Sequence, residues 1–178
     1  MRSCKYSLPR GFTLIELLVV VAMVAILLSL AAPSFNATRL NQKLASSAND
    51  LYASLLQARN EALVQNRRVT VAPITAGDWK PGWRIYVDMN NNGSFDSGTD
   101  TFIVSSGAVD DSFTVTDAGG GAAPTDFSFD SRGFLRGSTA NRVVFTSPKT
   151  SRAKHVIVFA TGRSRICDPK FDNAACSD

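Results

Sequence analysis

The sequence predicts an α+β protein in which one long N-terminal helix packs on an antiparallel, β-rich head. Apolar side chains recur every three or four residues up to about Gln65, with no glycine or proline after Pro33 in that stretch. After residue 68 the period changes to two, and clusters rich in Gly, Asn, Asp and Pro separate short apolar runs. Short strands joined by short turns favour antiparallel pairing, and an amphipathic helix can cover one face of such a sheet.

The first apolar run, Phe12–Ala32, is 21 residues long and contains a single charge, Glu16. About 20 apolar residues suffice to cross a bilayer as a helix. The run follows the basic residues Arg2, Lys5 and Arg10, and a basic segment in this place keeps the N-terminus cytoplasmic. A secretory signal peptide would have a shorter apolar core followed by an A-x-A-like site. We therefore expect residues 12–32 to span a membrane.

The helix continues beyond this run with one apolar face, which should lie on the sheet. Its members are Leu40, Leu44, Ala48, Leu51, Leu55, Ala58 and Ala62. In the head, alternation of apolar and polar residues predicts seven strands. They are residues 69–74, 83–88, 101–105, 112–116, 126–130, 141–146 and 154–161.

Charge is unevenly distributed along the chain, although the formal net charge is only +4. Residues 69–130 contain nine aspartates against two basic residues, whereas residues 131–167 contain eight basic residues and no acidic one. The eight are Arg132, Arg136, Arg142, Lys149, Arg152, Lys154, Arg163 and Arg165. Such asymmetry favours an anionic partner for the C-terminal strands. The alternative is that acidic and basic strands interleave in space and neutralise each other.

The N-terminal segment resembles that of type IV pilins and pseudopilins. The family pattern is a basic leader ending in glycine, then Phe-Thr-Leu-Ile-Glu, then an apolar helix with a proline near its end; Gly11, Phe12–Glu16 and Pro33 match it. The resemblance implies cleavage by a prepilin peptidase between Gly11 and Phe12, and N-methylation of Phe12. It also implies a filament in which Glu16 pairs with the amino terminus of a neighbouring subunit. From its position alone, Glu16 can instead reach the lipid headgroups.

These expectations divide the chain into a cleaved leader (1–11), the pilin helix (12–66) and a periplasmic head (67–178). Cys4 leaves with the leader, so the mature chain keeps Cys167 and Cys176. Because the head would lie in an oxidising compartment, we expect these two to form a disulfide. A metal site is the alternative, but it needs further ligands nearby, and none is evident.

Two arginines stand close together before Cys167. In an extended segment Arg163 and Arg165 point to the same side, about 7 Å apart, which suits successive phosphates of a nucleic acid. An ordinary solvated strand face is the alternative. The sequence Gly162-Arg163-Ser164-Arg165 also resembles the G-R-x-R motif of FimT minor pilins in the FimT/GspH family, which are associated with DNA uptake. The resemblance implies that Gly162, Arg163 and Arg165 bind DNA. Secondary candidates are Lys149, Arg152 and Lys154.

The segment 82–100 resembles the middle hairpin of the same family. Within it, Asp88-x-Asn90-x-Asn92-Gly93 also matches the start of an EF-hand calcium loop. That loop needs a bidentate glutamate at its twelfth position, where this chain has Thr99. We expect an Asn- and Gly-rich turn here and keep calcium binding as the alternative.

Catalytic residues are not evident in the sequence. His155 is the only histidine, and no nucleophile and base stand in a recognisable pattern. We therefore expect no enzymatic activity, no cofactor, no metal and no small-molecule substrate.

The sequence as a whole predicts a minor type IV pilin that binds DNA without sequence preference for uptake in natural transformation. Its partners would be DNA, other pilins in a filament, the prepilin peptidase and the inner membrane, which it would cross once. The alternative is a structural role, either as a GspH-like pseudopilin of type II secretion or as a pilus-priming subunit. In that case the basic stretch would contact a neighbouring subunit.

Overall fold

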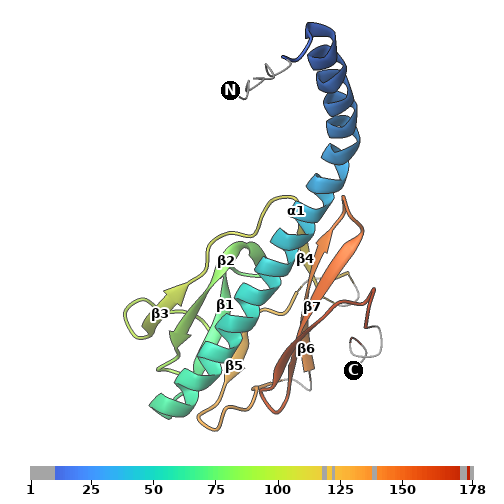
Figure 1. The fold of residues 1–178 in the computed structure, drawn as a ribbon. Coiled ribbons are helices and arrows are strands. Elements are labelled where there is room, and N and C mark those ends of the chain that lie inside the picture. The colour runs from blue at the N-terminus through green and yellow to red at the C-terminus, as the bar shows by residue number, and fades with distance from the viewer. Residues whose placement is uncertain (1–10, 118–119, 122, 138–139, 173–175, 177–178) are drawn as a thin grey trace, which may run out of the picture. The chain divides into compact units, whose positions relative to one another are not determined.

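The computed structural model describes residues 11–117, 120–121, 123–137, 140–172 and 176, without the side chains of residues 29–34 and 140. The leader expected before Gly11, with Cys4, lies outside the described residues. One helix is followed by eight strands (Figure 1). They are α1 (Leu14–Gln65), β1 (Val69–Thr75), β2 (Asp78–Val87), β3 (Thr101–Ser105), β4 (Thr114–Thr116), β5 (Phe127–Phe129), β6 (Ala140–Ser147), β7 (Arg152–Phe159) and β8 (Ser164–Cys167).

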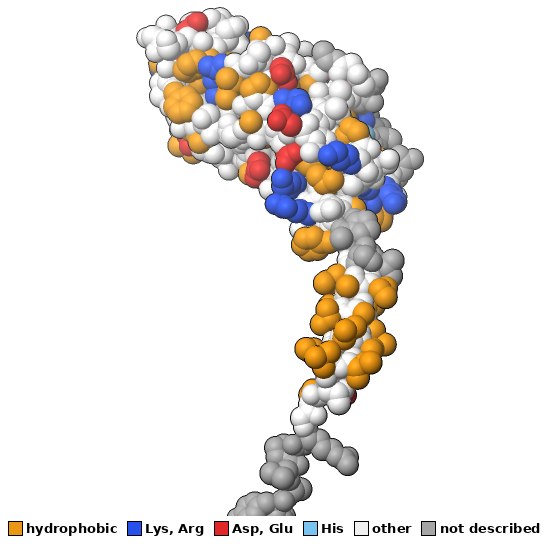
Figure 2. All heavy atoms as spheres, turned by 90° about the horizontal axis from the view of Figure 1, so that it is seen from above, with side chains coloured by type: hydrophobic (Ala, Val, Ile, Leu, Met, Phe, Trp, Pro, Cys, Tyr) orange, Lys and Arg blue, Asp and Glu red, His pale blue; other side chains and the backbone are white. Residues whose placement is uncertain are grey.

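The chain divides into two compact units, residues 1–38 and 39–178. In the first unit, α1 begins at Leu14 because Thr13 caps it: the Glu16 amide donates to the Thr13 hydroxyl at 3.3 Å. The apolar side chains from Leu14 to Leu28 are exposed and gather along this part of the helix (Figure 2). Within the described residues, no helix has a stretch both long and apolar enough to qualify as a membrane span.

The second unit contains two four-stranded antiparallel sheets rather than a single sheet. The first sheet has the order β3-β2-β1-β5, and the second has the order β4-β6-β7-β8. Most strand pairs join neighbours in sequence, as the short turns predicted. There are two exceptions: β5 pairs with β1, and β6 also pairs with β4 across the connection that contains β5. In the second sheet β8 is an edge strand.

The core lies between the sheets and the Arg39–Gln65 part of α1, which runs across both of them (Figure 1). The predicted helix face is confirmed: Leu44, Ala48, Leu51, Leu55, Ala58 and Ala62 are all buried. Trp79 and Trp83 of β2 are also buried, and their indole nitrogens donate to the Pro124 carbonyl and the Ser54 hydroxyl. Satisfying the indole nitrogens in this way allows two large aromatic side chains to be buried without an unpaired donor.

Several strand ends differ from those predicted. β2 begins at Asp78, five residues early, because the chain reverses at Ala76-Gly77 and the buried Trp79 already belongs to the strand. β7 ends at Phe159, two residues before the predicted end, because a turn follows it. β8 was not among the predicted strands. It is only four residues long, and Arg165 interrupts its apolar pattern.

Candidate nucleic-acid interface

The turn between β7 and β8 positions the two predicted arginines. The Gly162 amide donates to the Phe159 carbonyl at 2.8 Å, and the Phe159 amide donates to the Arg163 carbonyl at 2.9 Å. Gly162 has a φ of 76°, in the left-handed region. This combination of a tight turn followed by a left-handed residue is a common three-residue hairpin connection with a glycine bulge. It places Arg163 opposite Phe159, immediately before β8 begins at Ser164.

Glycine is required at position 162 for a second reason, which is the closeness of another backbone. Gly162 is buried, and a Cβ there would overlap the carbonyl oxygen of Gly133. Arg59 of α1 donates to that same oxygen at 3.0 Å and to the Thr161 carbonyl at 3.2 Å. The helix therefore holds the turn through Arg59, a residue that our sequence analysis did not identify. In the sequence, Arg59 is marked only by its position next to Ala58, a member of the predicted apolar helix face.

Arg163 and Arg165 both lie against one aromatic ring. Their guanidinium carbons are 4.9 Å and 5.1 Å from the centre of the Phe159 ring. Arg163 is exposed and Arg165 is half-buried. A cation on an aromatic face gains about 0.5–1 kcal/mol at exposed sites. The ring therefore restrains two otherwise flexible side chains on the same side of the strand.

This side of the second sheet faces away from α1. Val156 and Val158 of β7 point into the core, whereas Ile157 and Phe159 pack in a separate small cluster with the two cysteines. Across the strands, Arg142 of β6 and Arg165 of β8 flank Ile157 in one row. Arg142 thus adds a third arginine to this face. The sequence could not reveal it, because strand register places it there.

The secondary candidates lie in different surroundings. Arg152 and Lys154 both pair with the buried Asp168, at 2.9 Å and 3.1 Å. Burial raises the pKa of Asp168, but the hydrogen bond from Lys154 and the nearby cations outweigh it, so the pKa lies below its ordinary value. Lys149 is exposed in the β6–β7 turn, at the far end of β7 from Gly162, about 24 Å away at 3.4 Å per residue.

A disulfide joins Cys167 to Cys176, which confirms the predicted pairing. It ties the C-terminal segment to β8, next to the two arginines. His155 lies within 4.8 Å of both sulfurs, but sulfurs joined in a disulfide do not act as thiolate metal ligands. Burial and the charge of Arg142 lower the pKa of His155, although Asp168 opposes them.

The basic and acidic stretches lie mostly in different sheets. Of the strands within residues 69–130, β4 is the only described one that pairs in the sheet of β6, β7 and β8. Among the named strands the two stretches meet only where β4 pairs with β6, and neutralisation in space stays an alternative. Arg132 does pair with its sequence neighbour Asp130 at 2.8 Å. Arg152 and Lys154 of β7 pair with Asp168, which lies outside the acidic stretch.

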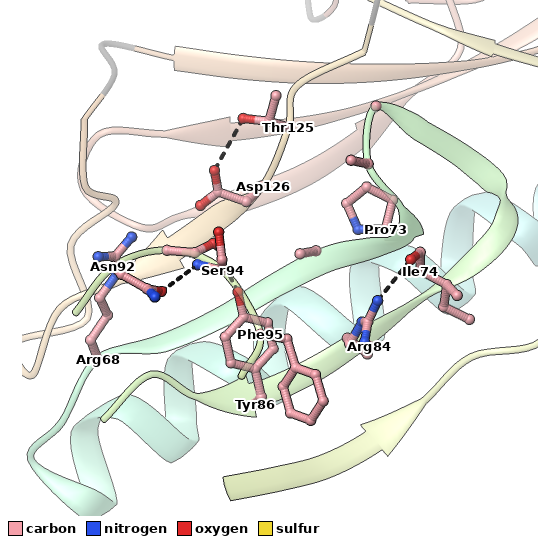
Figure 3. A pocket seen from close by; sticks show the side chains of 14 residues that line it. Arg68, Pro73, Ile74, Arg84, Tyr86, Asn92, Ser94, Phe95, Thr125 and Asp126 are labelled. Atoms are coloured by element: carbon pink, nitrogen blue, oxygen red, sulfur yellow. Dashed lines mark hydrogen bonds between the residues drawn. The ribbon is translucent and has the colours of Figure 1, made fainter. Parts of the chain in front are cut away.

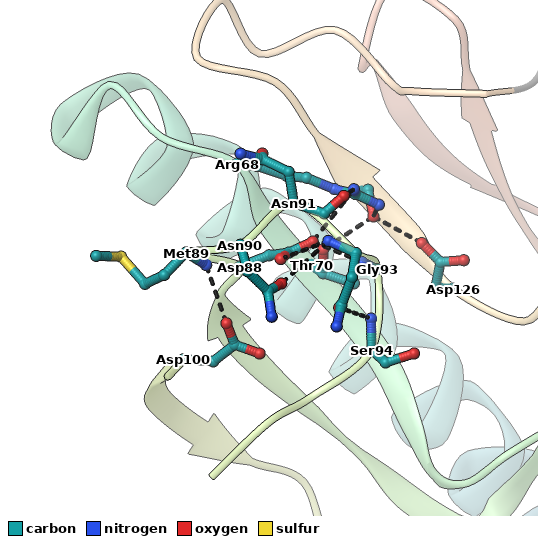
Figure 4. Close-up of polar contacts among 12 residues, drawn as sticks. Arg68, Thr70, Asp88, Met89, Asn90, Asn91, Gly93, Ser94, Asp100 and Asp126 are labelled. Atoms are coloured by element: carbon teal, nitrogen blue, oxygen red, sulfur yellow. Dashed lines mark hydrogen bonds and ion pairs between the residues drawn. The ribbon is translucent and has the colours of Figure 1, made fainter. Parts of the chain in front are cut away.

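The Asp88–Asn92 turn already contains an internal cation. Arg68 lies 3.2 Å from the buried Asp88 carboxylate and donates to the Asn91 carbonyl at 2.8 Å (Figure 4). The Asp88 oxygens also accept from the Asn92 and Gly93 amides. The turn is therefore held by a guanidinium and its own amides, as an Asn- and Gly-rich turn would be. A calcium ion would have to displace these contacts.

A cavity of about 450 Å³ lies on the outer side of the first sheet (Figure 3). Arg84 lines the cavity and donates to the Ile74 carbonyl at 2.7 Å. The guanidinium carbon of Arg84 lies 5.0 Å from the centre of the Phe95 ring. Burial and the charge of Asp88 raise the pKa of Tyr86, whose hydroxyl donates to the Gly93 carbonyl. On another wall of the cavity, the Thr125 hydroxyl donates to the neighbouring Asp126 carboxylate at 3.2 Å.

The N-terminal residues of the predicted pilin motif are exposed. Phe12 precedes the helix and is 82% exposed, and Glu16 lies in the first turn of α1. An acidic side chain in this place is stabilised by the amino end of the helix dipole. Phe12 and Glu16 are therefore both exposed at the start of α1.

Two family models match the chain. Residues 47–162 match the model described as type II transport protein GspH, and residues 8–32 match the prokaryotic N-terminal methylation motif. The second match includes Gly11, Phe12 and Glu16. The first match ends at Gly162, so the two following arginines lie just outside it.

Individual relatives agree with these matches. A pilin-like protein of Thermus thermophilus, PilA1, is 37% identical over 89 residues, which are 50% of this chain and 54% of the relative. The chain therefore spans about half the length of this curated relative. Two crystal forms of the type IV minor pilin FimU from Pseudomonas aeruginosa have TM-scores of 0.57 and 0.55 at 22% identity. They cover 71% and 70% of this chain and 90% and 92% of those structures, and they show the fold alone.

The GspH model covers more than half of the chain, and the methylation motif covers its N-terminus. The fold is that expected of such proteins, with an N-terminal helix packed on antiparallel sheets. The chain therefore belongs to the GspH family of pilin-like proteins.

Proposed function

We propose that this protein is a minor type IV pilin that binds DNA without sequence preference during uptake in natural transformation. The observation that carries the proposal is the arrangement of Arg163 and Arg165 against the single ring of Phe159, where the β7–β8 turn enters the edge strand β8. Two guanidiniums restrained on one side of a strand can each bind a phosphate through paired hydrogen bonds. Such contacts position nucleic acid without reading its sequence.

The surroundings support this assignment of the main contacts. Gly162 permits the turn that brings Arg163 onto the Phe159 ring, and Arg142 adds charge to the same face. The charges of Arg152 and Lys154 are compensated by Asp168, which makes them weaker contacts. Lys149 is remote from Gly162, so it would contact only a long polynucleotide.

We propose that the N-terminus is processed and anchored as in other pilins. A prepilin peptidase would cleave between Gly11 and Phe12, and Phe12 would then be N-methylated. Residues 12–32 would cross the inner membrane, leaving residues 67–178 in the periplasm. In the filament, Glu16 would pair with the amino terminus of a neighbouring subunit, since a carboxylate among apolar residues requires a cationic partner. The proposal assigns no enzymatic activity, cofactor or small-molecule substrate.

DNA binding by the full chain in detergent micelles tests the proposal. The Arg163→Gln/Arg165→Gln variant is compared with the parent, using a labelled duplex of mixed sequence at several salt concentrations. Each phosphate neutralised on duplex DNA contributes about 0.9 to the slope of log affinity against log salt. We expect the variant to lose about tenfold or more in affinity and about two units of slope. The control variant Arg39→Gln/Lys80→Gln removes the same charge elsewhere and should bind as the parent does.

A structural role is the second candidate, and the match to a model named for type II transport favours it. The edge strand β3 also exposes Phe102 and Val104, which are 53% and 39% accessible and suit contact with another subunit. If the parent fails to bind duplex DNA even at low salt, the DNA-binding proposal is wrong. A pseudopilin or pilus-priming role would then be the better interpretation, and deletion of the gene should abolish secretion or piliation.

A further inference from the structure

A second concentration of arginines lies where α1 ends. Asn66 has a φ of 52°, a left-handed conformation that commonly terminates helices. The chain turns there, and Arg67 and Arg68 leave the helix axis. Together with Arg136 of the loop that follows β5, they line a cavity of about 250 Å³. Asp88 and Asp130 also line it.

The two carboxylates of this cavity each have their own cation. Asp88 pairs with Arg68 at 3.2 Å, and Asp130 pairs with Arg132 at 2.8 Å. Burial raises the pKa of Asp130, but hydrogen bonds from Arg132 and from the Phe134 amide bring the pKa below its ordinary value. Asp130 is therefore held as an anion whose charge is already compensated.

Arg67 and Arg136 take no part in these two ion pairs. Both side chains are exposed, and neither forms an ion pair among the residues that the structure describes. Two surplus guanidiniums at the mouth of one cavity favour an oxyanion and disfavour a metal cation. Ser131, which also lines the cavity, can add a hydroxyl donor. A phosphodiester suits this set, because it offers two oxygens and one negative charge.

A single loop links the cavity to the β7–β8 turn, which Arg163 and Arg165 follow. Residues 130–136 line the cavity on one side and touch the β7–β8 turn on the other. The Leu135 amide donates to the Ala160 carbonyl at 3.0 Å, and Gly133 packs against Gly162. A strand of nucleic acid that contacts Arg163 can therefore continue over this loop toward Arg136.

We propose that Arg67 and Arg136 form a second phosphodiester contact, extending the DNA path from the β7–β8 turn across residues 130–136 to the end of α1. This inference rests on the proposed DNA binding, and it adds a separate site to it. A longer path binds more phosphates of one strand, so it raises affinity for polynucleotides more than for short oligonucleotides. It also makes binding more sensitive to salt.

The test uses the full chain in detergent micelles and the same labelled duplex. The Arg67→Gln/Arg136→Gln variant is expected to lose about tenfold in affinity, with a salt slope smaller by about two units. The conservative variant Arg67→Lys/Arg136→Lys should keep the slope, because the charges remain, and recover part of the affinity. The Arg39→Gln/Lys80→Gln variant is the control for loss of charge, and thermal unfolding of each variant checks that the head remains folded.

The outcomes separate this inference from the proposed function. If Arg67→Gln/Arg136→Gln binds as the control does while Arg163→Gln/Arg165→Gln loses affinity, the second contact is wrong and the proposed function stands. Equal losses of affinity in Arg67→Gln/Arg136→Gln and Arg67→Lys/Arg136→Lys, with an unchanged salt slope, would also overturn the second contact. The effect would then not be electrostatic. Absence of binding by the parent would overturn both.

Discussion

The α-carbon of Gly162 lies against the carbonyl oxygen of Gly133, so closely that an added Cβ would overlap that oxygen. The same oxygen accepts a hydrogen bond from Arg59 of α1 at 3.0 Å. Helix, loop and hairpin turn therefore meet at one point of the head. Both proposed contact regions depend on it, because Arg163 follows Gly162 directly and Arg136 belongs to the loop of Gly133.

Replacing this glycine should disturb both stability and DNA binding. We expect Gly162→Ala to lower the free energy of unfolding by about 2 kcal/mol or more, since it combines a strained left-handed backbone with a steric overlap. Gly77→Ala is the matched control, because Gly77 has nearly the same φ, 77°, and open space around it. Thermal and urea unfolding of the two variants give the comparison. Equal losses in both would mean that contact with Gly133 is unimportant.

The ring of Phe159 should contribute to binding by holding two arginines. Phe159→Leu keeps an apolar side chain in the small cluster near the disulfide but removes the aromatic face. With about 0.5–1 kcal/mol for each of the two cation–ring contacts, we expect a loss of roughly fivefold to thirtyfold in affinity. Titration with duplex DNA measures it. Phe95→Leu, which removes the ring beside Arg84 on the other sheet, is the control and should bind normally.

Stability should fall in acid partly through Asp168. Its pKa is held below the ordinary value of 3.8, so the folded state binds a proton less readily than the unfolded chain does. The resulting stabilisation is complete above the unfolded pKa and is lost as the pH falls through the lower folded pKa. Unfolding measured from about pH 5 to about pH 2 should therefore show decreasing stability, less steeply in Asp168→Asn.

The Asp168→Asn substitution should reduce the pH dependence of stability without abolishing it. The pKa values of Asp96, Asp110 and Asp130 are also lowered, by hydrogen bonds from Asn90, Lys43 and Arg132 among others. Asp50→Asn, on the exposed face of α1, serves as the control. An Asp168→Asn profile identical to that of the parent would show that its pairs with Arg152 and Lys154 contribute nothing to folding.

The helix and most strands were predictable because their patterns are local. The apolar face from Leu44 to Ala62 repeats at the helical period, and the structure buries it. The strand β8 was missed because four residues carrying an arginine give no clear alternation. The division into two sheets was also missed, since alternation along a strand shows which side chains share a face but not which strands pair.

The candidate site was predictable only in part. Gly162, Arg163 and Arg165 are neighbours in sequence, so their motif was visible. Arg59 reaches the same turn from a helix more than 100 residues away, and Arg142 reaches the same face through strand pairing. The compensation of Arg152 and Lys154 by Asp168 likewise depends on the register of β7 and β8.

The sequence by itself determined which residues can form the N-terminal helix, where the methylation motif begins and which part of the chain carries surplus positive charge. Periodicity, motif spacing and charge are properties of the linear chain. Only the tertiary structure decided which of those charges are compensated and which gather on one surface. Ion pairing falls off steeply with distance, and residues far apart in sequence come within a few ångströms only when the sheets and the helix pack together. Arg67 and Arg136 became neighbours in this way, at a cavity that neither segment forms alone.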